Sequence, residues 1–232
     1  MTDLTLEQKR VLVVGGSSGI GLAVVKRLRR QGANVIVASR GAPERMAALP
    51  ERLDAVETHA FDITAPNACE GLFESIGAID HLIVAVRPEV RSGAFVDVDI
   101  DEARRAFETK FWGQYRLVQV AARYISETGS IVLTSGIAGE RIYRGASTMA
   151  LINGATETLC RTLAVELGPV RVNCVSPGFV EAKGESVQDY ARQFPAGRLG
   201  TLDEIASGYL SLMVNPYVTG TINVLDGGAR LI

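Results

Sequence analysis

The stretch Val14-Gly15-Gly16-Ser17-Ser18-Gly19-Ile20-Gly21 decides the fold of this chain, because it joins a short apolar run to a helical pattern. Residues 11–14 are all apolar and predict a buried strand, and residues 19–30 are spaced as in an amphipathic helix. The glycines between them permit a sharp turn and let a phosphate approach the backbone closely. Free N–H groups at the start of the helix would face that phosphate. The stretch therefore predicts a dinucleotide-binding turn.

The rest of the chain repeats this alternation of short apolar runs and longer helical patterns. Strands are predicted at residues 11–14, 35–38, 55–59, 82–86, 131–134, 170–175 and 221–225, and helices at 19–30, 66–76, 100–125, 148–167 and 202–214. Such an alternation predicts an α/β fold, in which one doubly wound parallel sheet carries helices on both faces. We expect a single Rossmann-like domain over residues 1–232. The polar, Gly- and Pro-punctuated residues 178–200 are interpreted as a lid.

Composition excludes several classes of function. The 232 residues are 47% hydrophobic with a formal net charge of -2, which gives no basic surface for nucleic acid or for an anionic membrane. No apolar run is long enough to cross a bilayer, and the N-terminus lacks an apolar signal core. The cysteines Cys69, Cys160 and Cys174 lack metal-ligand spacing and fit a reducing compartment. We therefore expect a cytoplasmic protein with no bound metal.

The end of the second predicted strand indicates which nicotinamide cofactor is bound. An acidic residue there would accept hydrogen bonds from the ribose 2′-hydroxyl and repel a 2′-phosphate. This chain carries Ser39 and Arg40 instead. A guanidinium pairs with phosphate through two charge-assisted hydrogen bonds, so we predict NADP(H) as the cofactor. The alternative is that Arg40 is an ordinary exposed loop residue.

Further motifs follow the glycine-rich turn in a fixed order. They are Asp62-Ile63, Arg171-Val172-Asn173-Cys174-Val175-Ser176-Pro177-Gly178, Arg198-Leu199-Gly200, Val218-Thr219-Gly220 and Asp226-Gly227-Gly228. Together with the turn they resemble the short-chain dehydrogenase/reductase family over nearly the whole chain. The resemblance implies a set of residues around the cofactor, in addition to Ser39 and Arg40: Gly15, Ser17, Ser18, Gly19, Ile20, Gly21, Asp62, Ile63, Ala85, Val86, Pro177, Gly178 and Val180.

The catalytic pattern of that family is absent. In the family a Tyr exchanges a proton with the substrate oxygen, a Lys four residues later lowers the pKa of that Tyr, a Ser orients the substrate and an Asn supports a proton relay. Here Met149 and Asn153 stand at the Tyr and Lys positions, Gly136 at the Ser position and Lys110 at the Asn position. Other landmarks change too, with Val84-Ala85-Val86-Arg87 replacing N-N-A-G and Ala182 replacing a Thr. The chain resembles a divergent subgroup that lacks the usual active-site residues.

Three residues are candidates to supply the missing chemistry. A lysine in a desolvated site titrates nearer neutral pH, so Lys110 is either an acid and anion binder or a structural replacement whose ammonium caps a carbonyl. Ser135 either orients a substrate oxygen or bonds only the backbone. Tyr143 either reaches the site from the loop before the helix or is a surface tyrosine.

These observations leave three functions open. The first is an atypical NADP(H)-dependent oxidoreductase acting on a small carbonyl, alcohol or enone substrate. The second is a non-catalytic NADP(H)-binding sensor or partner protein. The third is a non-redox isomerase or cyclase on the same scaffold. From the resemblance we also expect a homodimer or homotetramer, formed by the two long helices around Trp112, although core burial explains Trp112 equally well.

Overall fold

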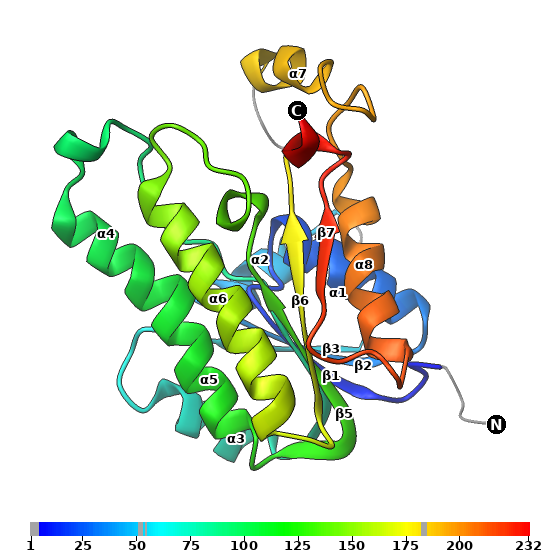
Figure 1. The fold of residues 1–232 in the computed structure, drawn as a ribbon. Helices are drawn as coiled ribbons and strands as arrows, with labels where there is room; N and C mark the ends of the chain where they lie inside the picture. The colour runs from blue at the N-terminus through cyan, green and yellow to red at the C-terminus, as the bar shows by residue number, and fades with distance from the viewer. Residues whose placement is uncertain (1–4, 51–52, 54, 182–184) are drawn as a thin grey trace.

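The computed structural model describes residues 5–50, 53, 55–181 and 185–232. Within that part of the chain one sheet of parallel strands runs through the molecule in the order β3-β2-β1-β4-β5-β6-β7 (Figure 1). The strands are β1 (Arg10–Val14), β2 (Asn34–Ser39), β3 (Val56–Ala60), β4 (Ile79–Val84), β5 (Ile125–Thr134), β6 (Arg171–Pro177) and β7 (Ile222–Leu225). The strand order reverses direction at β1, so the predicted doubly wound α/β fold is confirmed.

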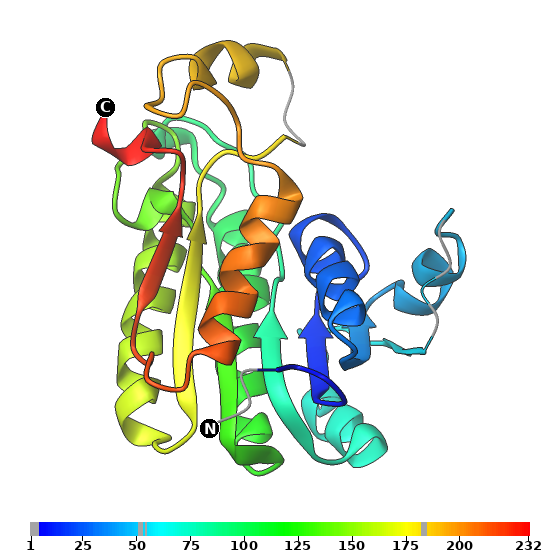
Figure 2. The same cartoon turned by 90° about the vertical axis from the view of Figure 1, so that its right-hand side faces the viewer.

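Helices cover both faces of the sheet. They are α1 (Gly19–Arg30), α2 (Ala42–Ala47), α3 (Ala68–Ile76), α4 (Ile100–Phe107), α5 (Gly113–Ala121), α6 (Ser147–Glu166), α7 (Glu185–Ala191) and α8 (Leu202–Val214). One apolar cluster packs α3, α5 and α6 against the sheet, and a second packs α1 and α8 against the opposite face (Figure 2). Strands buried on both faces carry consecutive apolar side chains, which explains why β1 is apolar at four positions in a row.

The predicted helix at residues 100–125 is interrupted. The structure has α4, then a π-helical turn, η2 (Glu108–Trp112), then α5, which ends at Ala121. Ile125 already belongs to β5, so the C-terminal end of the prediction was wrong. Gln114 accounts for the turn, because its Nε2 donates to the Lys110 carbonyl oxygen at 2.6 Å and so satisfies a helix carbonyl from the side.

Two short helices were not predicted. Pro43 lies in the first turn of α2, where its fixed φ and missing N–H favour a helix start. The second is α7, which lies beyond the arrowhead of β6 at the carboxyl edge of the sheet (Figure 1). It falls within residues 178–200, and Ala191 at its end packs in a small third cluster with Ile137, Phe194 and Ala229. Apolar packing against residues distant in sequence, rather than a regular helical pattern, therefore holds this segment.

Candidate functional site

The glycine-rich turn joins β1 to α1 at the carboxyl edge of the sheet, where β1 has β2 on one side and β4 on the other. Gly15 has a φ of +84°, and a Cβ at this residue would lie 2.6 Å from the Ala85 carbonyl oxygen. A Cβ at Gly21 would collide with the Gly15 carbonyl oxygen. Only glycine fits these two positions, because the turn packs tightly against itself and against the end of β4.

The outer side of the turn is open. Gly19 has a φ of +51°, and a Cβ there would meet no atom within 4 Å. Ser18, the residue before α1, makes no side-chain cap, so the N–H groups of the first helical turn around Ile20 keep their hydrogen-bonding capacity. The helix dipole adds positive potential at the same place. This cradle of backbone donors fits the pyrophosphate of a dinucleotide.

The residues that we assigned to the adenosine end of the cofactor gather beside this turn. Ser17 is buried, and its Oγ lies 2.7 Å from Ser39 Oγ, so the two hydroxyls tie the turn to the end of β2. The Arg40 side chain is 72% exposed. Hydrogen bonds from Thr64 hold the pKa of Asp62 below its usual range, and the charge of Arg40 lowers it further. Arg40 and Asp62 therefore share one patch at the ends of β2 and β3.

Ile63, Ala85 and Val86 lie at the ends of β3 and β4. Ile63 is buried, and a Cβ at Gly113 of α5 would lie 3.0 Å from its side chain. Ala85 donates its N–H to the Val14 carbonyl oxygen at 2.8 Å and is half-buried, as is Val86. These small and apolar side chains line the edge of the sheet between the glycine-rich turn and β5.

Three predicted cofactor residues lie at the end of β6, which neighbours β5 on the side away from β4: Pro177, Gly178 and Val180. Pro177 ends the strand, and Gly178 donates its N–H to the Leu225 carbonyl oxygen of β7 at 2.9 Å. Val180 then pairs with Gly200 in an isolated parallel bridge. All three residues lie at the same edge of the sheet as the glycine-rich turn. Ala182, at the position of a family threonine, lies outside the described residues.

Lys110 is buried at the centre of this edge. It is 4% exposed, and its Nζ donates to the Ser135 carbonyl oxygen and to Asn153 Oδ1, each at 2.7 Å. Burial lowers the pKa of the Lys110 ammonium to about 8, and the nearby Cys174 and Glu157 oppose that shift. The structural alternative that we considered, an ammonium that caps a carbonyl, matches these contacts.

Ser135 lies between two charged side chains. Its carbonyl oxygen accepts from Lys110, and its Oγ donates to Glu157 Oε1 at 2.9 Å. Gln114, which is fully buried, completes the network because its Oε1 accepts the N–H of Thr134 at 3.2 Å. The Ser135 hydroxyl therefore has a carboxylate partner inside the protein. We had not predicted Glu157 or Gln114, although each lies four residues after a polar residue of the site, on the same helix face.

From the sequence we predicted that Lys110 and Asn153 stand at the family's Asn and Lys positions. Lys110 on η2 and Asn153 on α6 contact each other directly. Met149, one turn before Asn153, is half-buried. A Cβ at Gly136 would lie 3.0 Å from Asn153 Nδ2. Lys110, Gly136 and Asn153 thus form one connected arrangement.

Tyr143 lies in an aromatic cluster above this edge. Its ring meets Phe179 edge-on with centroids 5.7 Å apart, the Arg141 guanidinium carbon lies 5.5 Å from its ring centroid, and Tyr190 and Phe194 pack on the other side of Phe179. The Tyr143 hydroxyl is the one buried side-chain polar atom in the described part of the chain that lacks a hydrogen-bond partner. Burial raises the pKa of this phenol. The hydroxyl thus stays protonated and retains one free donor.

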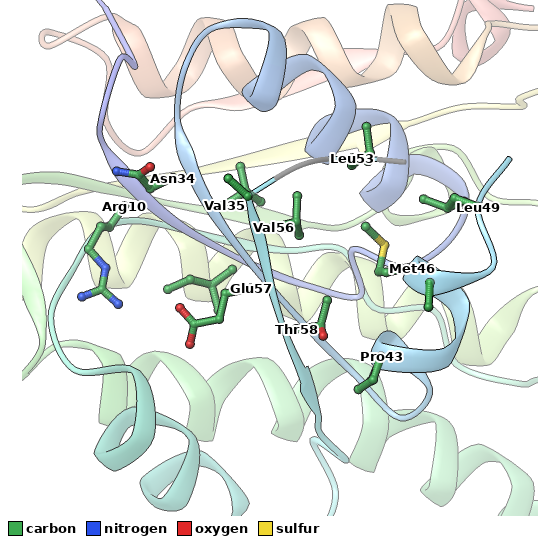
Figure 3. Close-up of a pocket in the computed structure, with 13 residues that line it drawn as sticks. Arg10, Asn34, Val35, Pro43, Met46, Leu49, Leu53, Val56, Glu57 and Thr58 are labelled. Carbon is green, nitrogen blue, oxygen red and sulfur yellow. The ribbon is translucent and has the colours of Figure 1, made fainter. Parts of the chain in front are cut away.

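A large pocket lies elsewhere. It has a volume of about 1060 Å³ and lies between α2 and the neighbouring strands (Figure 3). Its lining residues are Arg10, Asn34, Val35, Ile36, Pro43, Met46, Ala47, Leu49, Leu53, Ala55, Val56, Glu57 and Thr58. None of them is a predicted cofactor or catalytic residue. We assign it no function.

The described residues contain neither a cluster of metal ligands nor a membrane-spanning helix. No three His, Cys, Asp or Glu side chains come together as a potential metal site. No helix there combines the length and apolar character that crossing a bilayer requires. The three cysteines are buried as free thiols.

Comparison with known proteins defines the class to which this fold and site belong. A family model described as enoyl-(acyl carrier protein) reductase matches residues 14–230. The short-chain dehydrogenase/reductase ucsE from an Acremonium species is 32% identical over 259 residues, which is 97% of this chain and 97% of the relative. This chain belongs to the short-chain dehydrogenase/reductase family.

Solved structures agree with that assignment. A small-chain dehydrogenase in complex with NADPH is 36% identical, with a TM-score of 0.85 over 97% of this chain and 100% of that one. The MalC reductase/Diels-Alderase from Malbranchea aurantiaca is 28% identical, with a TM-score of 0.89 over 99% of this chain and 98% of that one. The chain therefore has the fold of these proteins along its full length.

Proposed function

We propose that this protein is an atypical NADP(H)-dependent oxidoreductase that acts on a small carbonyl, alcohol or enone substrate. The observation that carries the proposal is the open glycine cradle at the start of α1, where Gly15 and Gly21 cannot bear a side chain and Gly19 faces free space. The exposed Arg40 beside it fits a 2′-phosphate. The likeness to a dehydrogenase that was solved with NADPH supports the choice of cofactor.

When bound, the nicotinamide cofactor supplies or accepts the hydride. The residues of the chain must then handle a proton at the substrate oxygen. The buried Lys110 ammonium, whose pKa burial lowers to about 8, donates a hydrogen bond to the Ser135 carbonyl oxygen. Tyr143 has a protonated hydroxyl with no partner among the described residues. We assign Tyr143 as the candidate proton donor and keep Lys110 and Ser135 as further candidate catalytic residues.

The cofactor assignment is tested by titrating purified protein with NADPH and NADH and following nicotinamide fluorescence. We expect NADPH to bind more tightly, and Arg40→Ala to weaken NADPH binding about tenfold to a hundredfold, as for a lost charge-assisted hydrogen bond. NADH binding should not change. Arg30→Ala is the matched control, because it removes the same charge from the far end of α1. Equal affinities for the two nucleotides, or an Arg40→Ala variant with normal NADPH binding, would contradict the assignment.

The reaction is tested with a panel of carbonyls, alcohols and enones, followed at the absorbance of the reduced nicotinamide. We expect Lys110→Ala and Tyr143→Phe each to lower turnover by about 10²-fold or more, which is typical when one acid–base contributor is lost. NADPH binding without turnover across the whole panel would point to the sensor or partner function instead.

A cyclisation is a second candidate, and a specific likeness favours it. The MalC protein, a reductase/Diels-Alderase, shares the fold of this chain over 99% of its length. An oriented cycloaddition needs a positioned hydrogen-bond donor but no transferred proton. Conversion of a diene substrate with no change in nicotinamide absorbance would support this candidate.

We also propose that the protein is a homodimer or homotetramer that associates through α4, α5 and α6, which lie side by side on one face (Figure 1). Four apolar side chains on these helices and on the η2 turn between α4 and α5 are between 41% and 64% exposed: Ile100, Trp112, Tyr115 and Leu151. The Trp112 and Tyr115 rings lie with centroids 5.7 Å apart and form an aromatic surface. Clustered exposed apolar side chains of this kind are typical of an interface.

A further inference from the structure

The residue that follows Ser135 at the carboxyl end of β5 has no side chain, and the amide of Asn153 occupies the adjacent space. A Cβ at Gly136 would lie 3.0 Å from Asn153 Nδ2 but 3.7 Å from its Oδ1. The nitrogen of the amide therefore faces Gly136 more closely than the oxygen does. The backbone of Gly136 is extended, with φ 161°, so the absence of a side chain here is not a conformational requirement.

Lys110 determines which way this amide points. An ammonium donates hydrogen bonds and accepts none, so only the oxygen of an amide can face it. Lys110 Nζ donates to Asn153 Oδ1 at 2.7 Å, in a region where both side chains are buried. A flipped amide would place its NH₂ group against the ammonium and lose this bond. The Asn153 NH₂ group is therefore held on the side away from Lys110, beside Gly136.

The Asn153 NH₂ group has spare donor capacity. Among the described residues, Asn153 makes its side-chain hydrogen bond through Oδ1 alone. Asn153 is 2% exposed, and none of the hydrogen bonds in the described part of the chain uses its Nδ2. A fixed donor at the carboxyl edge of a parallel sheet lies where such folds bind their ligands.

We propose that Asn153 Nδ2 donates a hydrogen bond to the carbonyl oxygen of the substrate, and that Lys110 is the positioning residue that aims it. This inference rests on the proposed function, because it assumes a carbonyl ligand at this edge. A neutral amide polarises the C=O bond without giving up a proton. It therefore serves a reduction, in which another group supplies the proton, and a cyclisation, in which none is transferred. Gly136 places no side chain next to the donor.

The test uses side-chain amide NMR resonances of the ¹⁵N-labelled full chain, with Asn153 assigned through Asn153→Asp. The probe is 9,10-phenanthrenequinone, added to protein saturated with NADP⁺ so that no reductant is present. We expect the probe to shift the Asn153 resonances.

Gly136→Ala should weaken probe binding about tenfold with unchanged NADP⁺ affinity, because its methyl group blocks Nδ2 and leaves the contact with Lys110 in place. Lys110→Met should bring the two Asn153 amide protons closer in chemical shift, as expected once the amide rotates. Thr158→Ala, an exposed change on α6, is the matched control.

The outcomes separate the two proposals. Asn153 resonances that do not respond to the probe, or a Gly136→Ala variant with normal probe binding, overturn the role of Asn153, whatever the nucleotide titration gives. Asn153 resonances that are unchanged in Lys110→Met overturn the positioning role of Lys110. A protein that does not bind NADPH contradicts the proposed cofactor, a result read from nicotinamide fluorescence alone. Circular dichroism of each variant distinguishes a local effect from loss of the fold.

Discussion

At the scale of single residues, the site depends on charges that are buried but still paired. Lys110 is buried with two oxygen acceptors, and Glu157 accepts a hydroxyl hydrogen nearby. Such an arrangement costs desolvation energy and returns it only through well-formed hydrogen bonds. Removing one hydrogen-bond partner leaves the desolvation energy of the buried charge uncompensated. Changing the charge state of Lys110 shows how large that desolvation energy is.

The stability of the protein should depend on pH through Lys110. The pKa of Lys110 in the folded protein, about 8, lies below its ordinary value of 10.5, so the unfolded chain binds more protons between these two pH values. Stability therefore rises as the pH increases from about 8 to 10.5, by on the order of 3 kcal/mol at most, relative to Lys110→Met. Urea unfolding at pH 7 to 10.5 measures this difference. Lys110→Arg, which stays charged, should show no such rise. A constant difference between wild type and Lys110→Met would refute the prediction.

At the scale of elements, neighbouring strands are joined by a buried polar pair. His81 of β4 stands opposite Ser130 of β5 in the parallel register, and His81 Nδ1 lies 2.8 Å from Ser130 Oγ. Both side chains are buried. Burial lowers the pKa of His81 to about 4, so the imidazole stays neutral in the folded sheet at neutral pH.

Acid should weaken the sheet through His81. Between pH 6.5 and about 4 the unfolded chain takes up a proton that the folded chain does not, so stability falls as the pH decreases through this window. We expect His81→Phe to reduce the slope of unfolding free energy against pH there. Ser130→Ala should keep most of the slope, because burial rather than the hydroxyl is the main cause. Equilibrium unfolding at pH 4 to 7 makes the comparison, and equal slopes for wild type and His81→Phe would count against it.

At the scale of the whole molecule, one face built from α4, α5 and α6 carries exposed aromatic residues, whereas the carboxyl edge carries the site. The π-helical turn η2 belongs to both, because it bears the buried Lys110 and the half-exposed Trp112. An interface on that face would therefore contact η2, the helical turn that positions Lys110.

Disrupting the proposed interface should change the assembly. We expect Trp112→Glu to shift the protein from dimer or tetramer to monomer in sedimentation velocity, because a carboxylate cannot be buried there without a partner. Arg30→Glu, which places a new carboxylate on α1, is the control and should leave the assembly intact. A wild-type protein that sediments as a monomer at micromolar concentration would rule the interface out.

The sequence by itself determined the fold and the glycine-rich turn, because both depend on local patterns: consecutive apolar residues in strands, and glycines at Gly15 and Gly21 where the backbone leaves no room. The boundary at Ile125 and the short helices α2 and α7 were not predicted, and α7 is held by packing with residues distant in sequence rather than by periodicity. Only the tertiary structure decided the contacts of Lys110, which reach across 25 and 43 residues to Ser135 and Asn153. Hydrogen-bond partners that far apart follow from how elements pack, and no local spacing encodes them.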